Sequence, residues 1–159
     1  MVAGNAEFDS KVRLEVYRLF LRDGLAPAIR DVAAALESSA TEIRAAFERL
    51  ADEHKLVLQP ESRELLMASP LSGVPTPFLV EVEGHSTPLF GNCIWDAMGI
   101  PPMLHRDGKI PAGRIVTGCG CCGERLVVRI AEGHVDAPVS SVCHFALPAK
   151  RWWDDIVFN

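Results

Sequence analysis

A stretch rich in proline and glycine divides the chain into two parts of different texture. Residues 69–77 contain three prolines and one glycine, which are residue types that interrupt helices and central strands. Apolar residues before this stretch recur mostly at helical spacing, whereas those after it form short runs typical of strands. The sequence therefore predicts an α+β protein with a domain at 1–68, a connector at 69–77 and a second domain at 78–159.

The first part is expected to form three helices followed by a hairpin. Helices are predicted over residues 10–23 and 28–37, and a third begins at the capping box Ser39-Ala40-Thr41-Glu42. Two short strands follow at 55–58 and 64–67, separated by a turn. This order is typical of a winged-helix domain.

Two roles are open to such a domain, DNA binding through the third helix or support of the rest of the protein. That helix has four acids and two bases: Glu42, Arg44, Glu48, Arg49, Asp52 and Glu53. The whole chain carries a net charge of −5. Because an acidic face repels phosphate, the sequence favours the scaffold and does not predict nucleic acid as a partner.

The second part is expected to form a small mixed or antiparallel sheet with one inserted helix. Strands are predicted at 78–82, 114–117, 125–130 and 139–147. A short helix is predicted over residues 91–99, between the first and second of these strands.

The composition and the cysteines bear on location and chemistry. Hydrophobic residues make up 48% and charged residues 23% of the 159 residues, as in ordinary globular proteins. We find neither a secretory signal nor an apolar run long enough for a membrane span, which predicts a cytoplasmic protein. Its five cysteines, Cys93, Cys119, Cys121, Cys122 and Cys143, should then be reduced thiols available for packing, metal binding or reaction.

Cys93 and Asp96 form the first candidate site, at the start of the predicted short helix. With Asn92 as the N-cap, Cys93 would lie in the first turn, where the helix end favours the thiolate. Asp96 follows three residues later on the same face. A sulfur nucleophile beside a proton-carrying carboxylate can bind a soft electrophile and deliver a proton to it. The same spacing also fits a buried structural cysteine with Asp96 as a surface or capping residue.

A second candidate site is the glycine-flanked cluster of Cys119, Cys121 and Cys122. Such a density of thiols suits a soft metal, although the spacing matches no standard zinc pattern. His134 and Cys143 could complete this site only through the fold. The alternative is a glycine-rich hairpin whose small cysteines have no common function.

Two further groups of residues are given structural roles. Cys143 and His144 would point to opposite faces of the predicted strand, so they are not expected to form a catalytic pair. Trp152 and Trp153, at the start of a predicted terminal helix, are expected to cover the core.

The order of these features resembles that of the alkylmercury lyase (organomercurial lyase) family. The marks are the helical first part, Cys93-x-x-Asp96 after a glycine, the Cys119–Gly123 loop, and Phe145-Ala146-Leu147-Pro148 leading into Trp152-Trp153. The resemblance implies protonolysis of a carbon–mercury bond, with Cys93 as the metal-binding thiolate and Asp96 as the proton carrier. It implies no resident cofactor, with an organomercurial or soft metal ion as the small-molecule partner.

The chain departs from the family pattern at its second catalytic cysteine. That cysteine follows a Phe, whereas here Phe158 is followed by Asn159, which implies a divergent or C-terminally shortened member. The candidates for a substitute thiol are Cys143, Cys119, Cys121 and Cys122. Two alternatives to the lyase follow: a soft-metal-binding protein that uses Cys93, Cys119, Cys121 and Cys122, and a metal-sensing winged-helix regulator. A dimer would cover a sheet edge left open by a missing final segment.

Overall fold

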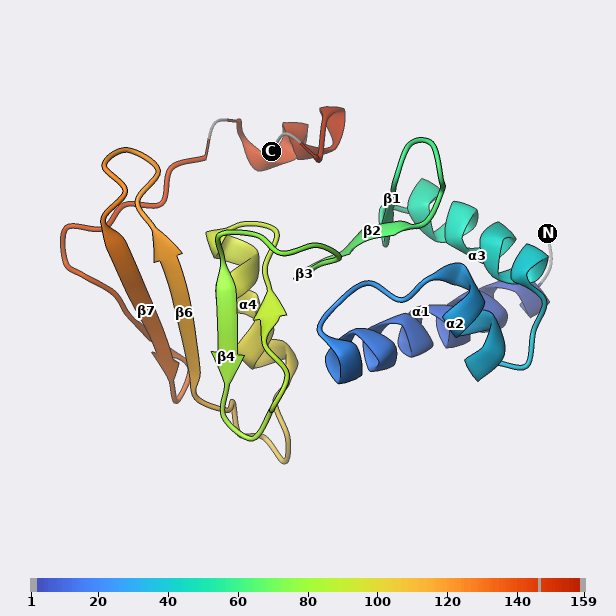
Figure 1. Ribbon diagram of the computed structural model, residues 1–159, viewed down its shortest axis with the longest axis horizontal. Coiled ribbons are helices and arrows are strands. Elements are labelled where there is room, and N and C mark those ends of the chain that lie inside the picture. The colour runs from blue at the N-terminus through green and yellow to red at the C-terminus, as the bar shows by residue number, and fades with distance from the viewer. Residues whose placement is uncertain (1–2, 146, 158–159) are drawn as a thin grey trace.

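The computed structural model describes residues 3–145 and 147–157, and it shows helices followed by antiparallel sheets, an α+β architecture (Figure 1). The first part contains the helices α1 (Ala3–Asp23), α2 (Ile29–Ala35) and α3 (Ala40–Asp52). These helices lie where the sequence predicted them, although α1 begins before residue 10. None of the helices in the described ranges is long and apolar enough to cross a membrane.

The third helix confirms the predicted capping box. The hydroxyl of Ser39 accepts a hydrogen bond from the backbone N–H of Glu42 at 3.2 Å. The Glu42 carboxylate in turn accepts one from the backbone N–H of Ser39 at 2.9 Å. The apolar face of α3, formed by Ile43, Ala46, Phe47 and Leu50, is buried. The cap and the apolar stripe together explain why α3 begins and packs where it does.

A three-stranded antiparallel sheet follows α3, in the order β1-β2-β3. Its strands are β1 (Val57–Leu58), β2 (Leu65–Ala68) and β3 (Leu71–Ser72). The first two correspond to the predicted hairpin, whereas β3 lies inside the predicted connector. Leu71 also forms an isolated antiparallel bridge with Gly91, which ties this sheet to the segment before the candidate site.

The second sheet has five antiparallel strands in the order β5-β4-β6-β7-β8. The strands are β4 (Leu79–Val82), β5 (Leu89–Phe90), β6 (Gly113–Gly118), β7 (Arg125–Ala131) and β8 (His134–Asp136). Helix α4 (Ile94–Met103) is inserted between β5 and β6 and packs against β3, β4 and β6 (Figure 1). The inserted helix was predicted, but it lies about one turn further along the chain.

The strand predicted at 139–147 is wrong for the described residues of that segment. Residues 137–145 have no regular strand, and the Val142 side chain is 87% exposed. The backbone N–H of Ser141 instead donates to the carbonyl of Pro138 at 2.8 Å, which closes a turn. The sheet ends at β8, which pairs with β7, and the described residues of this segment do not extend it.

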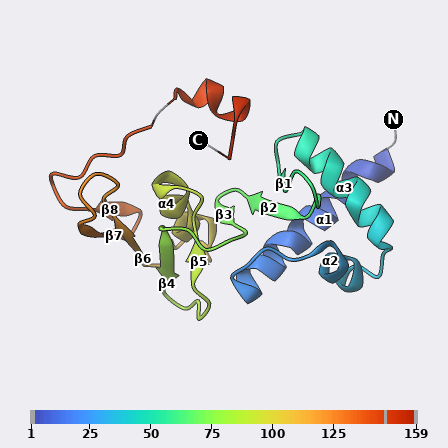
Figure 2. The same ribbon diagram turned by 45° about the horizontal axis from the view of Figure 1, so that its top comes forward.

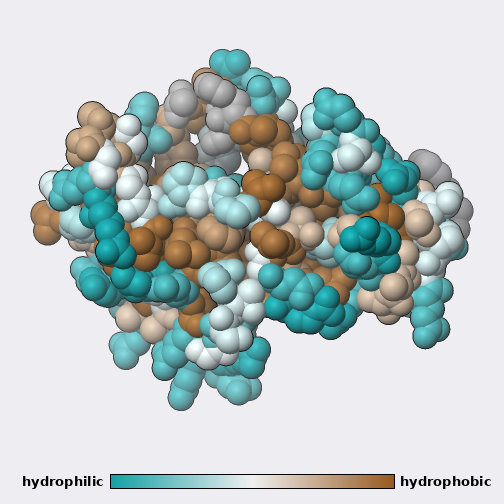
Figure 3. All heavy atoms as spheres, viewed as in Figure 1, coloured by the Kyte–Doolittle hydropathy of each residue, from teal (hydrophilic) through white to brown (hydrophobic). Residues whose placement is uncertain are grey.

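The two parts share one buried cluster of apolar side chains, from Val12 in α1 to Ile130 in β7. Figure 3 shows apolar side chains gathered over the middle of one face, where the helical part meets the sheet part. The chain then leaves β8 and returns over α4 toward the helices, ending in the short 3₁₀ helix η1 (Ala149–Asp154) (Figure 2). The candidate site lies beneath this returning segment.

Candidate active site

Helix α4 begins at Ile94 and is capped by the side chain of Cys93. Cys93 has an extended backbone, and its sulfur accepts a hydrogen bond from the backbone N–H of Asp96 at 3.5 Å. The prediction of Asn92 as the N-cap is therefore wrong by one residue. The sulfur takes the place that a serine or threonine oxygen has in other caps, and this holds it at the end of the helix.

A glycine permits the close packing that sets this position. A Cβ atom on Gly91 would lie 2.6 Å from the backbone nitrogen of Ala97, in the first turn of α4. The backbone of Gly91 is itself held, because its N–H donates to the carbonyl of Phe78 at 3.1 Å and its carbonyl accepts from Thr76 at 2.6 Å. Gly91 thus lets the end of β5 touch the helix that carries Cys93 and Asp96.

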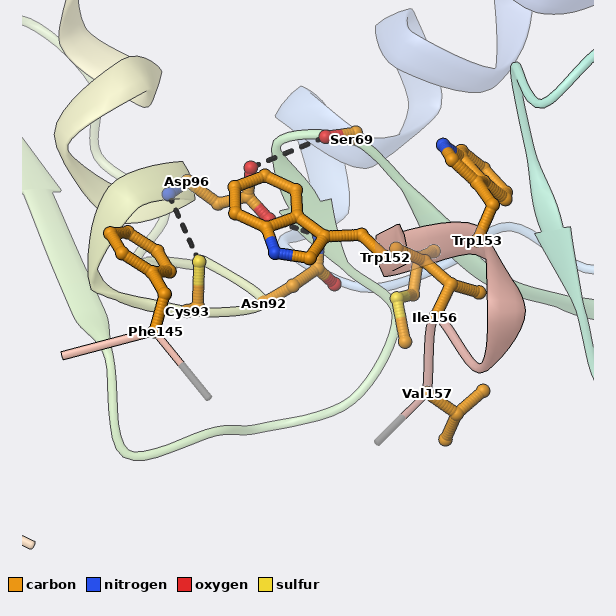
Figure 4. A pocket seen from close by; sticks show the side chains of 10 residues that line it. Ser69, Asn92, Cys93, Asp96, Phe145, Trp152, Trp153, Ile156 and Val157 are labelled. Carbon is orange, nitrogen blue, oxygen red and sulfur yellow. Dashed lines mark hydrogen bonds between the residues drawn. The ribbon is translucent and has the colours of Figure 1, made fainter. Parts of the chain in front are cut away.

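Asp96 is held by two neighbouring side chains. The amide of Asn92 donates to Oδ2 at 3.0 Å, and the hydroxyl of Ser69 donates to Oδ1 at 3.3 Å (Figure 4). Burial raises the pKa of Asp96, against the opposing effect of hydrogen bonds from Asn92, Ser69 and the Cys93 thiol. A raised pKa lets this carboxyl hold a proton at higher pH than an exposed aspartate.

The pKa of the Cys93 thiol is also raised, chiefly by burial. The backbone N–H groups of Asp96 and Trp95 act in the opposite direction, as expected at a helix start. The negative charge of Asp96 and its hydrogen bond from the thiol add to the increase. The prediction that the helix end favours the thiolate is therefore wrong in net direction, because desolvation outweighs the N–H groups. The thiol and the carboxyl lie next to each other at the start of α4, where the Asp96 backbone N–H donates to the Cys93 sulfur.

Cys93 and Asp96 face a largely apolar cavity of about 180 Å³ (Figure 4). Its other lining residues are Met67, Ser69, Asn92, Phe145, Trp152, Trp153, Ile156 and Val157. The rings of Phe145 and Trp152 lie 5.4 Å apart, and the Trp152 indole N–H donates to the carbonyl of Leu147 at 3.0 Å. The two tryptophans therefore line the cavity, rather than covering the core as predicted.

The sequence missed several residues of this site. Ser69 lies 27 positions before Asp96, so no local pattern links the two. Asn92 was noted only as a helix cap, and Phe145 only as part of a strand. The aromatic residues close to Pro148 were a usable signal, but only the fold shows that they return to α4.

The other cysteines lie elsewhere. Cys119, Cys121 and Cys122 lie in the turn between β6 and β7, and Cys93 is the only cysteine among the described residues that line the first cavity. Cys119 and Cys143 line a different cavity, which contacts the other side of α4. Within the described ranges, no three His, Cys, Asp or Glu side chains are grouped to hold a metal ion.

Cys119 has a pKa that its neighbours in the turn change. The backbone N–H groups of Cys122 and Cys121 and the Cys122 thiol lower the pKa of Cys119. His134, His144 and Cys143 are exposed, and His144 is not paired with Cys143 across a strand because no strand forms there. Phe158 and Asn159, where the family pattern places its second thiol, lie outside the described residues.

Comparison with protein families decides the relationship suggested by these features. The family model of alkylmercury lyase (MerB) matches residues 71–158, more than half of the chain. The chain belongs to the alkylmercury lyase family. The match includes α4, Cys93, Asp96 and the segment that covers the cavity.

A solved structure shows the same fold. It is the crystal structure of the mercury-bound form of MerB2, with a TM-score of 0.59 and 18% sequence identity. The similarity covers 82% of this chain and 61% of the MerB2 chain, so the present chain spans less than two thirds of that protein. Sequence comparison with curated proteins gives no match.

Proposed function

We propose that this alkylmercury lyase family member cleaves carbon–mercury bonds by protonolysis, with Cys93 as the metal-binding sulfur and Asp96 as the proton carrier. The observation that carries the proposal is the Cys93–Asp96 pair, held together at the start of α4 by the Asp96 N–H···sulfur hydrogen bond, at the wall of a single apolar cavity. No resident cofactor is required, because mercury enters as part of the substrate.

The proposed reaction has two steps. In the first, the Cys93 sulfur displaces a ligand X from R–Hg–X, the thiol proton passes to Asp96, and X leaves as an anion. In the second, the Asp96 carboxyl protonates the carbon bonded to mercury, R–H leaves, and Hg(II) stays on the Cys93 sulfur beside the carboxylate. A soft metal prefers sulfur to oxygen ligands, and burial keeps the proton on Asp96 until carbon can accept it.

The cavity supports an organic substrate of limited size. An apolar cavity of ~150 Å³ holds a benzene molecule in a protein core, and this one holds about 180 Å³. Phe145 and Trp152 present ring faces and edges to its interior, which favour contact with an aromatic group. We therefore expect phenylmercury to fit.

The test is release of benzene from phenylmercury in the presence of excess small thiol, measured by gas chromatography. Cys93→Ser should abolish both benzene release and tight binding of the mercurial at this site. Asp96→Asn should lower release by ~10²–10⁴-fold, the usual contribution of a proton-transfer group, while it leaves binding intact. Cys143→Ser, an exposed thiol outside the cavity, is the matched control and should release benzene at the original rate.

A second candidate function is binding of a soft metal without turnover. The observation in its favour is that Cys93 has no second cysteine among the described residues lining its cavity. Stoichiometric mercury binding by the intact protein without benzene release would establish this function and exclude the lyase.

For the N-terminal part, we propose a winged-helix-like scaffold rather than a DNA-binding or regulatory domain. Both arginines of α3 are already engaged, because Arg49 pairs with Asp9 at 2.6 Å and Arg44 donates to the carbonyl of Ser62 at 3.2 Å. Few positive charges are left on this helix for phosphate. Fluorescence anisotropy with labelled duplex DNA should show no binding at low salt, and salt-dependent binding would contradict the scaffold.

A further inference from the structure

We propose that Cys119 and Cys122 form a second soft-metal site, in which two thiolates bind one Hg(II)-like ion independently of Cys93. The site lies in the turn between β6 and β7, where the two cysteines are separated by Gly120 and Cys121. It differs from the proposed lyase site in its cavity, its exposure and its ligands.

The backbone of the turn brings the two cysteines together. The N–H of Cys119 donates to the carbonyl of Glu124 at 2.8 Å, and the N–H of Gly123 donates to the carbonyl of Cys119 at 2.8 Å. Gly123 has a φ of +74°, in the left-handed region that favours glycine. These bonds reverse the chain within residues 119–124 and keep the reversal closed.

The closed turn sets the spacing of the two side chains. Cys119 and Cys122 are three residues apart, and the bond from the Gly123 N–H to the Cys119 carbonyl closes a single turn of chain around them. Side chains three positions apart in such a turn are neighbours. The fold of the turn therefore supplies a pair of soft ligands on one loop.

The number of ligands indicates the class of ion. Structural zinc sites need four ligands in tetrahedral geometry, whereas among the described residues no three candidate ligand side chains are grouped together. A soft ion that accepts two sulfur ligands in line suits the pair, as Hg(II) does. On binding, the two thiols lose their protons and the ion gains two sulfur–metal bonds, so one Hg²⁺ replaces two H⁺.

The position of the pair gives an ion access from two sides. Cys122 is exposed to solvent, whereas Cys119 lines a cavity of about 440 Å³ together with Ile94 and Met98 of α4. Ile94 directly follows Cys93 in the sequence. The second site is thus open to ions from solution, and it lies against the same helix that carries the proposed reactive pair.

The experiment uses the full chain, fully reduced, with inorganic mercury(II) as the probe and iodoacetamide with peptide mass spectrometry as the readout. In the Cys93→Ser variant, one equivalent of Hg(II) should protect Cys119 and Cys122 from alkylation and leave Cys121 and Cys143 reactive. X-ray absorption should show two sulfur ligands. Adding Cys122→Ser should weaken the protection of Cys119 at least tenfold in a competition with a small dithiol.

Two single changes serve as matched controls in the Cys93→Ser background. Cys121→Ser lies in the same turn, and Cys143→Ser lies at the same cavity; neither should change the affinity. Protection of Cys121 or Cys143 in place of the pair, or equal losses for all three serine variants, would overturn the proposal. Because Cys93 is absent throughout, the outcome does not depend on whether the protein is a lyase.

Discussion

The pKa values of two cysteines in this protein are shifted in opposite directions by their surroundings. Burial beside Asp96 raises the pKa of Cys93, whereas backbone N–H groups and a neighbouring thiol lower the pKa of Cys119. Burial favours the neutral thiol, whereas backbone N–H groups that point at a sulfur favour the thiolate. At the scale of single residues, the surroundings of the two sulfurs therefore shift their pKa values in opposite directions.

Alkylation rates should reveal this difference. In the reduced protein near neutral pH, iodoacetamide should modify Cys119 several times faster than Cys93, because the thiolate is the reacting form. The rate at Cys93 should rise only when the pH exceeds the usual range of cysteine. Peptide mass spectrometry at a series of pH values measures both rates, and faster modification of Cys93 at neutral pH would contradict the assignment.

The carboxyl of Asp96 should make stability depend on pH in a defined direction. Its pKa is raised in the folded state, so the folded protein binds more protons than the unfolded chain between the two pKa values. The free energy of unfolding must therefore fall as the pH rises through that window, and the loss persists above it. Below the unfolded pKa the effect is absent.

Asp96→Asn should consequently be more stable than the original protein at neutral pH, with an advantage that disappears in acid. A flip of the Asn92 amide would help. Its Oδ1 is buried and has no hydrogen-bond partner, so after the flip it could accept a hydrogen bond from the amide introduced at position 96. Urea unfolding at several pH values measures the difference. Asp52→Asn, an exposed change at the end of α3, is the control; an equal pH dependence in both variants would contradict the role of burial.

At the scale of elements, the start of α4 depends on one glycine. The contact between Gly91 and the backbone of Ala97 leaves no space for a side chain, and the cap formed by Cys93 follows directly. The element prediction failed at 139–147, where valines and an aromatic residue suggested a strand. A strand also requires pairing with a neighbour, and the described residues of this segment pair with no strand of the sheet.

Substitution of Gly91 should therefore damage the site through its backbone. Gly91→Ala should lower the free energy of unfolding by about 1–3 kcal/mol, as overpacking does, and should reduce benzene release as well. Gly99→Ala, inside α4, meets only a distant Pro70 atom at 3.9 Å and should be neutral or slightly stabilising. Thermal unfolding and the benzene assay measure both, and equal behaviour of the two variants would refute the packing argument.

At the scale of the whole molecule, the C-terminal segment joins the two parts and closes the cavity. The ring of Trp153 stacks on His54, which follows α3, with centroids 4.0 Å apart and planes within 8°. The neighbouring Trp152 lies at the cavity above Asp96 (Figure 4). The helical part thus holds the segment that covers the proposed reactive pair.

Removal of this stacked ring pair should increase the motion of the C-terminal segment over the cavity more than it lowers the stability of the whole fold. Trp153→Ala should cost about 0.5–1.5 kcal/mol for the lost ring pair, in addition to its buried area. Hydrogen exchange over residues 147–157 should accelerate by more than exchange in α3. Val139→Ala, at a fully exposed position before the segment, should change neither, and unchanged exchange in Trp153→Ala would show that other contacts hold the cover.

Local sequence was sufficient for α3 and for placing Cys93 and Asp96 on one face of the short helix, whereas their proposed roles came from the family resemblance. A capping box, an apolar stripe and a three-residue spacing act between near neighbours, so they are readable from the chain itself. The raised pKa of Cys93 could not be predicted from the local sequence, because desolvation depends on groups that the fold brings together. Ser69 reaches Asp96 from 27 positions away, and Trp152 and Phe145 return to Cys93 from the far end of the sheet. Chain order thus determined the spacing of Cys93 and Asp96, whereas long-range packing determined the direction of their pKa shifts and the enclosure of the cavity, because both depend on residues distant in the sequence.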